Sequence, residues 1–265
     1  MPVMDITVDD PDHAYWTDGG AVVSNCSEFV HVNDTSCNLA SLNLREFQSE
    51  DGTLDIEAYQ AAIRILILAM EIIVDNAHYP TERIRHLTRL TRPLGLGYCN
   101  LGAFLMAAGL PYDSREARTL AFGITSLLTA TAYHRSAEIS RDHGGPFMVY
   151  PQNRETMLGI LEAYAQSAIE GGKTRSHVQA VDEALAGVLE QTWADALDLG
   201  RVYGYRNDET TAIAPTGTIS FFMAADTTSC EPDMALVKHK TLAGGRSLKT
   251  VNRTVGAALA RPGHS

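Results

Sequence analysis

TTAIAPTGTISF, residues 210–221, is the stretch that decides the fold class. Its first part, 210–214, is a short run of β-branched and small apolar residues and predicts a strand. Pro215 and Gly217 then shape a loop, and a helical start follows at Ile219. A strand that leads through a tight loop into a helix is typical of α/β proteins, so this stretch predicts that class.

Long helices are predicted on the N-terminal side of this stretch. Apolar residues recur at the i, i+3, i+4 spacing between Ile63 and Val74, which predicts a helix over 55–77. Asp113-Ser114 offer a cap for a second long helix over 115–142. The remaining signals are a stop at Gly144-Gly145-Pro146, further helices over 153–168 and 177–201, and a linker at 171–176.

Residues 1–25 differ in composition from the rest of the chain, with five Asp and no Lys or Arg. Residues 4–9 alternate apolar and polar side chains, which is a strand pattern. Asp18-Gly19-Gly20 is a hairpin-turn signal, and an extended run resumes at 21–23. The segment therefore predicts a β-hairpin, which cannot bury a core alone.

Composition limits the class of protein. The chain has 265 residues, 45% of them hydrophobic, and a formal net charge of −11. This negative balance argues against DNA or RNA polymers as partners, because binding a phosphate backbone needs a basic surface. The apolar run 61–74 contains Arg64 and Glu71 and is too short to span a membrane. Four cysteines without a CxxC pair, and an acidic N-terminus without an apolar signal region, predict a reduced, cytoplasmic chain.

Cys26-Ser27-Glu28 is the first candidate site. In an extended strand, residues two apart point to the same face, so the carboxylate could exchange protons for whatever the thiol attacks. The alternative is a buried structural cysteine beside a surface glutamate. Cys37 stands eleven positions after Cys26, and a turn between them could bring both thiols to one cavity; the alternative is a small inert core residue.

The loop at 214–220 is the second candidate site. Free N–H groups in the first turn of a helix, together with the positive end of its dipole, form a phosphate cradle. Small residues would let a phosphate approach the backbone there. An ordinary Ser/Thr-capped helix start explains the same pattern equally well.

Four stretches together resemble a known family. They are CSEFVHVNDTSCNLASLNL from Cys26, TRPLGLGYCNLGAFLMAAGLPYDS from Thr91, APTGTISFFMAADTTSCEPDMALVKHKTLAGG from Ala214, and KTVNRTVGAALARPGHS from Lys249. They are similar to the catalytic subunit of ribonucleotide reductase, most of all to the adenosylcobalamin-dependent class II group. The resemblance implies a partial ten-stranded α/β barrel, rich in helices, with a finger loop inside it.

The resemblance also implies roles for residues of the finger loop. Cys26 would become a thiyl radical that abstracts the 3′ hydrogen of the ribose, and Glu28 would shuttle protons to the 3′-OH. Cys37 would belong to the redox pair that donates two electrons as the 2′-OH leaves as water. Adenosylcobalamin would generate the radical.

Substrate and partners are implied in the same way. The substrate would be a ribonucleoside diphosphate, the reductant a thioredoxin-like protein or a dithiol, and the assembly a homodimer. The residues implied to hold the substrate are Ser27, Thr216, Gly217, Thr218 and Ile219.

The N-terminus departs from the family. The family places an Asn two residues before the radical cysteine, in an Asn-Pro-Cys-Ser-Glu-like run, whereas Ser24 and Asn25 precede Cys26 here. Residues 1–25 resemble the C-terminal end of an intein, which ends in Asn followed by Cys. Asn25 would cyclise, Cys26 would accept the upstream segment, and His13 would assist.

The expected organisation is therefore an intein remnant over 1–25 and reductase barrel over 26–265. The partner would be an upstream segment that carries the rest of the reductase and of the intein, and the chain alone is expected to be inactive. Two other interpretations remain open, namely a splicing element with reductase as cargo and a phosphate-binding α/β module without catalysis. Convergence of Cys26, Cys37 and the 216–218 loop on one nucleotide-sized cavity would favour the reductase.

Overall fold

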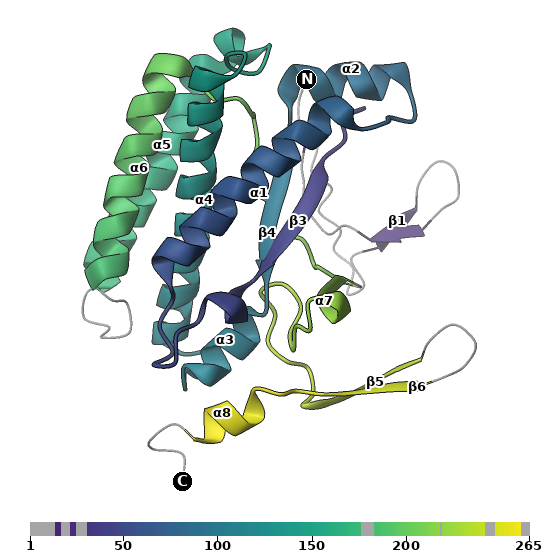
Figure 1. The fold of residues 1–265 in the computed structure, drawn as a ribbon, viewed down its shortest axis with the longest axis vertical. Coiled ribbons are helices and arrows are strands. Elements are labelled where there is room, and N and C mark those ends of the chain that lie inside the picture. The colour runs from purple at the N-terminus through teal and green to yellow at the C-terminus, as the bar shows by residue number, and fades with distance from the viewer. Residues whose placement is uncertain are drawn as a thin grey trace.

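The computed structural model describes residues 14–16, 22–24, 31–175, 183–217, 219–241 and 247–260. Three long helices, α4 (Arg115–Asp142), α5 (Tyr150–Arg175) and α6 (Glu183–Tyr203), lie side by side, and α1 (Ile56–Asn76) crosses in front of α4 (Figure 1). The parallel strands β3 (Asn38–Asn43) and β4 (Leu94–Cys99) lie behind α1. Helices and a parallel strand pair packed together confirm the α/β class.

The two strongest helix predictions are confirmed. Helix α1 starts after Asp55, whose side chain accepts a hydrogen bond from the Ala58 N–H, and it buries the apolar stripe that includes Ile63 and Ile67. Helix α4 starts after Ser114, whose hydroxyl accepts from the Ala117 N–H at 3.0 Å. Both boundaries follow from local capping and periodicity, which is why the sequence predicts them well.

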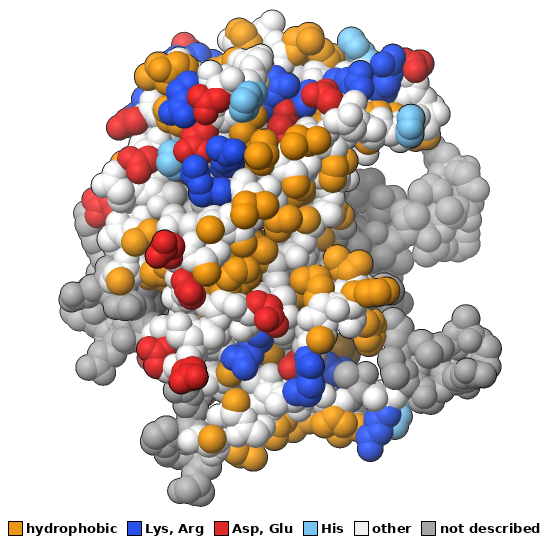
Figure 2. All heavy atoms as spheres, viewed as in Figure 1, with side chains coloured by type: hydrophobic (Ala, Val, Ile, Leu, Met, Phe, Trp, Pro, Cys, Tyr) orange, Lys and Arg blue, Asp and Glu red, His pale blue; other side chains and the backbone are white. Residues whose placement is uncertain are grey.

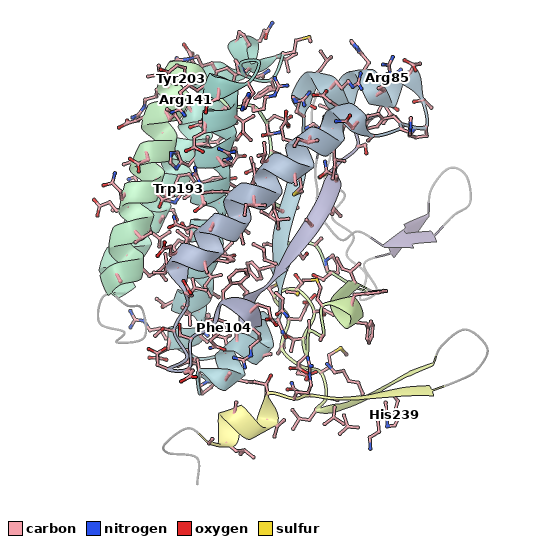
Figure 3. The ribbon with its side chains drawn as sticks, in the orientation of Figure 1. Arg85, Phe104, Arg141, Trp193, Tyr203 and His239 are labelled. Carbon is pink, nitrogen blue, oxygen red and sulfur yellow. The ribbon has the colours of Figure 1, made fainter. Side chains whose placement is uncertain are left out.

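The prediction of a linker at 171–176 is wrong for residues 171–175, because α5 continues to Arg175. A glycine inside a helix costs only ~1 kcal/mol relative to alanine. The packing of α5 against α6 outweighs the cost of Gly171 and Gly172. Trp193 on α6 is buried and donates from its indole Nε1 to Ser126 Oγ on α4 at 3.0 Å (Figure 3). This contact joins α6 to α4 and completes the helical layer.

The segment 209–214 runs beside β4, as expected for the third strand of a parallel sheet. Leu94 N donates to Glu209 O at 2.9 Å, and Ala212 N donates to Leu96 O at 3.1 Å. It forms a single parallel bridge, Leu96 with Thr211, and not a regular strand. Pro215 follows immediately and has no N–H to extend the pairing.

The described parts of the chain contain three separate two-stranded sheets and no closed barrel. In one of them, β1 (Ala14–Trp16) pairs antiparallel with β2 (Val22–Ser24), so a hairpin-like pair is present near the predicted turn. Its first strand is 14–16, whereas the alternation had pointed to 4–9, which lies outside the described residues. The remaining elements are η1 (Leu44–Phe47), α2 (Glu82–Thr91), α3 (Leu101–Ala107), α7 (Ile219–Phe222), β5 (Val237–Thr241), β6 (Ser247–Val251) and α8 (Val255–Leu259).

Apolar side chains also reach the surface. Figure 2 shows them along the outer side of α1 and around α7. Ile65 and Ile72 on α1 are exposed, and Phe222 on α7 is 93% exposed. Surfaces of this kind are typical of sites that another part of a protein covers.

Candidate functional site

The two faces of the β3–β4 pair differ sharply. Ala40 and Leu42 point into the core with α1, whereas the alternate residues Cys37, Leu39 and Ser41 lie on the opposite face. Leu39 is 51% exposed there. We call this second side, with Gly95 and Gly97 of β4, the glycine face.

Gly95 and Gly97 let neighbouring chain segments approach β4 closely. A Cβ at Gly95 would lie 2.9 Å from Cys37 Sγ, and one at Gly97 would lie 2.4 Å from the Ala212 carbonyl oxygen. Both contacts are shorter than side chains tolerate. The glycines therefore keep the Cys37 sulfur and the 209–214 segment tight against the strand.

Gly97→Ala is expected to lower the free energy of unfolding by about 1–3 kcal/mol, because the new methyl group overlaps backbone that cannot move aside. Gly159→Ala is the matched control. Gly159 is exposed in α5 and a Cβ there would meet nothing within 4 Å, so alanine should raise the free energy by about 0.5–1 kcal/mol. Chemical denaturation of both variants measures the difference, and equal effects would contradict the close approach at Gly97.

The loop after 209–214 reaches the same glycine face. Thr216 Oγ1 lies 3.3 Å from Ser41 Oγ. Ser41 is four residues after Cys37 on β3 and shares its face, which corresponds to about 13 Å at 3.3 Å per residue. Cys37 and the 216–219 loop thus lie on one face, separated by about the length of a nucleotide.

The loop has its own local geometry. Thr216 and Gly217 have positive φ, at 63° and 53°, and Gly217 N–H donates to Pro215 O at 2.7 Å. This N–H is therefore occupied within the loop, and α7 is only one turn long. A phosphate would rely on the Thr216 hydroxyl and neighbouring groups more than on the helix dipole that the sequence suggested.

The segment before β3 makes an ion pair that the sequence did not reveal. His31 Nε2 lies 2.6 Å from Asp208 Oδ2, and the half-buried Glu209 follows directly. Burial alone would lower the pKa of His31, but the hydrogen bond and charge of Asp208 raise it above its ordinary value. The only sequence signal was an acidic pair placed immediately before the expected strand 210–214.

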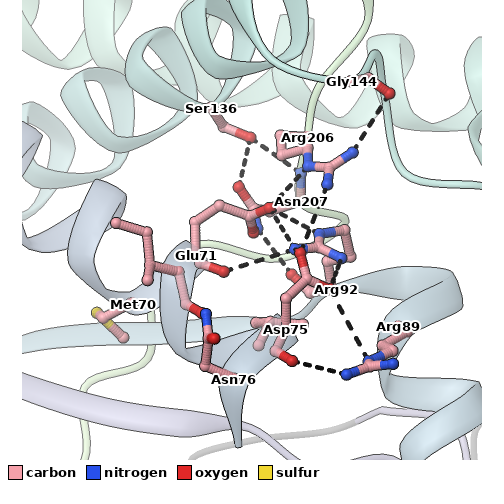
Figure 4. A network of polar contacts seen from close by, with 12 residues as sticks. Met70, Glu71, Asp75, Asn76, Arg89, Arg92, Ser136, Gly144, Arg206 and Asn207 are labelled. Carbon is pink, nitrogen blue, oxygen red and sulfur yellow. Dashed lines mark hydrogen bonds and ion pairs between the residues drawn. The ribbon is translucent and has the colours of Figure 1, made fainter.

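A buried ionic network includes Arg206 and Asn207, the two residues that precede Asp208 in the chain (Figure 4). Glu71 of α1 accepts from Arg92 Nε and from Arg206 Nε, each at 2.7 Å. Its other oxygen accepts from Asn207 Nδ2 at 2.7 Å, and Asn207 also pairs with Ser136 of α4. The network joins α1, α4 and the C-terminal end of α2 to the segment 206–207.

Several expected site residues lie outside the described residues. They are His13, Asn25, Cys26, Ser27, Glu28 and Thr218. Of the remaining site residues, the structure brings Cys37 and Thr216 to one face. Ile219 begins α7, where its side chain is half exposed. Cys99 is fully buried in the core.

The described residues do not by themselves fit adenosylcobalamin. Cavities of about 180, 220 and 530 Å³ have linings that include neither Cys37 nor 214–219. The described part of the chain also has no cluster of three His, Cys, Asp or Glu that could hold a metal. None of its helices is long and apolar enough to cross a bilayer.

Comparison with known proteins supplies the family. Residues 12–265 match the family described as "Ribonucleotide reductase, barrel domain". A protein of Rhodopirellula baltica named "Vitamin B12-dependent ribonucleotide reductase" is 44% identical over 256 residues, which cover 95% of this chain and 24% of that protein. Proteins with the same name from Streptomyces clavuligerus and Agrobacterium fabrum are 43% and 40% identical, over 90% and 96% of this chain and 25% and 21% of theirs.

The chain spans about a quarter of the length of these relatives. The match covers the glycine face, the 216–219 loop and the helical layer together. This chain belongs to the ribonucleotide reductase barrel-domain family.

Proposed function

We propose that this chain is part of a vitamin B12-dependent ribonucleotide reductase that converts ribonucleoside diphosphates to 2′-deoxyribonucleotides. The observation that carries the proposal is the Thr216–Ser41 contact, which brings the loop to the face of β3 that bears Cys37. A nucleotide whose phosphates lie at the loop would extend its ribose toward the thiol. The names of the relatives support the choice of reaction and of cofactor.

The proposed roles follow the resemblance residue by residue. Cys26 carries the thiyl radical, Glu28 exchanges a proton with the 3′-OH, and Ser27 contacts the substrate. Cys37 and a second cysteine, contributed by the upstream segment of the reductase, give up two electrons and two protons and become a disulfide as the 2′-OH leaves as water. A thioredoxin-like protein or dithiol reduces that disulfide back to two thiols. Adenosylcobalamin, held by the whole reductase and not by the described residues of this chain alone, would supply the radical chemistry.

A chimera tests this function. Residues 12–265 would replace the aligned segment of the Rhodopirellula baltica reductase, and deoxynucleotide formation would be followed with adenosylcobalamin and a dithiol. Turnover within about tenfold of the parent enzyme is expected, since the segments are 44% identical and share the site. A folded chimera that binds nucleotide but forms no deoxynucleotide would overturn the proposal. Diphosphate and triphosphate substrates are compared in the same assay.

The intein hypothesis for residues 1–25 rests on the order Asn25-Cys26 and on His13. The family match begins at residue 12, before the proposed junction, and so favours reductase sequence on both sides of it. The test is to mix the chain with the preceding segment of its gene product and measure mass. Splicing would remove residues 1–25 and create a new peptide bond at Cys26, whereas an unchanged mass would reject the intein.

A further inference from the structure

Residues 31–35, which we call the inter-cysteine turn, lie in the chain between Cys26 and Cys37. His31 Nε2 lies 2.6 Å from Asp208 Oδ2, in a contact that joins this turn to a part of the chain 177 positions away. The two side chains are only 11% and 19% exposed, so water has little access to the contact. Asp208 comes directly before the segment that runs beside β4 and leads into the proposed phosphate loop. The contact therefore connects the turn before one proposed catalytic element to the start of another.

The hydrogen bonds within the turn determine where the protons of His31 lie. The Thr35 hydroxyl lies 2.7 Å from the Val32 carbonyl oxygen, which can only accept, so the single hydroxyl proton is donated there. His31 Nδ1, 2.9 Å from the same Thr35 oxygen, must then donate. His31 Nε2 also donates, because an ionised Asp208 can only accept. An imidazole that donates from both nitrogens is the imidazolium cation, so this geometry requires a positive charge on His31.

Helix α2 holds the other side of the turn. The Ser36 N–H donates to Thr88 Oγ1 at 2.9 Å, and Asp34 Oδ2 lies 2.7 Å from Arg83 Nε. Asp34 has a φ of 62°, in the left-handed region that costs a residue with a side chain free energy. Contacts on both sides must hold a turn of this shape, and His31 supplies those on the side away from α2.

We propose that His31, as the imidazolium, is a positioning residue for the reductase, because its two hydrogen bonds hold the turn that precedes Cys37. The inference rests on the proposed function for the roles of the two cysteines. A neutral imidazole can donate only from one nitrogen, and when that bond goes to Asp208, the single Thr35 proton can serve His31 or Val32 but not both. Loss of the charge thus breaks one hydrogen bond of the turn. His31 acts through the backbone that carries the thiols, not on the substrate itself.

The pH dependence has a definite sign. Burial alone lowers the pKa of His31, but the hydrogen bond and charge of Asp208, together with the charge of Glu209, raise it above the ordinary value of 6.5. Burial raises the pKa of the Tyr133 phenol, which donates to the Asp208 main-chain oxygen at 3.3 Å and stays neutral. The imidazolium therefore holds the turn fully below about pH 6.5, and this effect is lost as the pH rises through the raised pKa of the folded chain.

The first test is an NMR titration of the full chain with nitrogen-15-labelled histidine, which reports the protonation of each imidazole nitrogen. At about pH 6.5, where an ordinary imidazole is half neutral, both nitrogens of His31 should be protonated. In the Asp208→Asn variant the midpoint of His31 should fall by about one unit or more, because a neighbouring opposite charge is lost. Asp195→Asn, at an exposed position of α6, is the matched control and should leave that midpoint unchanged.

A His31 midpoint below 6.5 in the unaltered chain would overturn the proposal, and this measurement needs no variant. An equal midpoint in the chain and in Asp208→Asn would overturn it as well.

The second test uses the chimera and separates positioning from binding. His31→Gln can still donate to Asp208 but carries no charge and makes one bond fewer within the turn. Its kcat should fall on the order of tenfold, since small displacements of reacting groups are costly, while the KM for the nucleotide stays within about twofold. His86→Gln, at an exposed position of α2, is the matched control and should keep both parent values.

The pH profile adds a measurement that lost stability alone would not change. The kcat of the parent chimera should fall as the pH rises through the midpoint of His31, and His31→Gln should lack this fall. Burial also raises the pKa of Glu209 to about 7, so the difference between the two proteins identifies the part due to His31. An unchanged kcat, or identical profiles, would overturn the positioning role. An inactive parent chimera would reject the proposed function, whereas the NMR titration would still decide whether His31 is charged in the turn.

Discussion

Replacing Glu71 with alanine is expected to lower the free energy of unfolding by about 3–5 kcal/mol. The side chain is 5% exposed and accepts hydrogen bonds from Arg92, Arg206 and Asn207 (Figure 4). Its removal leaves Arg92, equally buried, with only the half-exposed Asp75 as a counter-ion. Two guanidinium groups would then face a cavity in place of a carboxylate, which is the costly way to break a buried pair.

Chemical denaturation measures this loss, and Glu162→Ala is the matched control. Glu162 pairs with Arg201 at 2.9 Å, but both side chains are about half exposed. Water and salt screen such a pair, so its loss should cost below about 1 kcal/mol. The Glu71 variant should also loosen the 206–208 segment, because Arg206 and Asn207 each lose a hydrogen bond to the Glu71 carboxylate. If both variants lose the same stability, the network does not have the structural role assigned to it.

Cys37→Ser is expected to lower multiple-turnover deoxynucleotide formation by the chimera by on the order of 1,000-fold or more. A hydroxyl cannot form the disulfide that delivers two electrons, so reduction of the substrate has no electron donor at this position. The side chains are nearly the same size, and the site is only half-buried, so the fold should survive. Dithiol-dependent turnover measures the effect, with the thermal midpoint as a check on folding.

Cys230→Ser is the control for this prediction. Cys230 is a half-buried free thiol like Cys37, but it lies away from the glycine face, and its backbone carbonyl accepts a hydrogen bond from Tyr112. Turnover of that variant should stay within a few-fold of the parent chimera. If the Cys37→Ser chimera keeps its activity, this thiol has no redox role.

Local signals in the sequence predicted the helices well, and one such signal failed. Asp55 and Ser114 cap α1 and α4 because a short polar side chain reaches N–H groups only three residues away. The same local reasoning placed a linker at 171–176, where α5 in fact continues to Arg175. There the packing of α5 on α6 decided the boundary, and packing is not a local property.

The candidate site, too, could be predicted only in part from the sequence. The residue types at Cys37 and in the 216–219 loop, and their order along the chain, could be interpreted from the sequence alone. Their common face could not, since it depends on the register of β3 against β4 and on the contact between Ser41 and Thr216. The sequence also gave no sign that Asp208 pairs with His31, because the two residues are far apart along the chain.

The sequence by itself therefore determined the α/β class, the long helices with their caps and the family of the chain. Each of these depends on neighbours within a few positions or on a pattern of residue types. Only the tertiary structure decided that Glu71, an acidic residue in an apolar helix, is the buried centre of an ionic network. It also decided that His31 and Asp208, which are far apart in the chain, form an ion pair at 2.6 Å. Charge effects on a buried group depend on distance and solvent exclusion, and folding sets both.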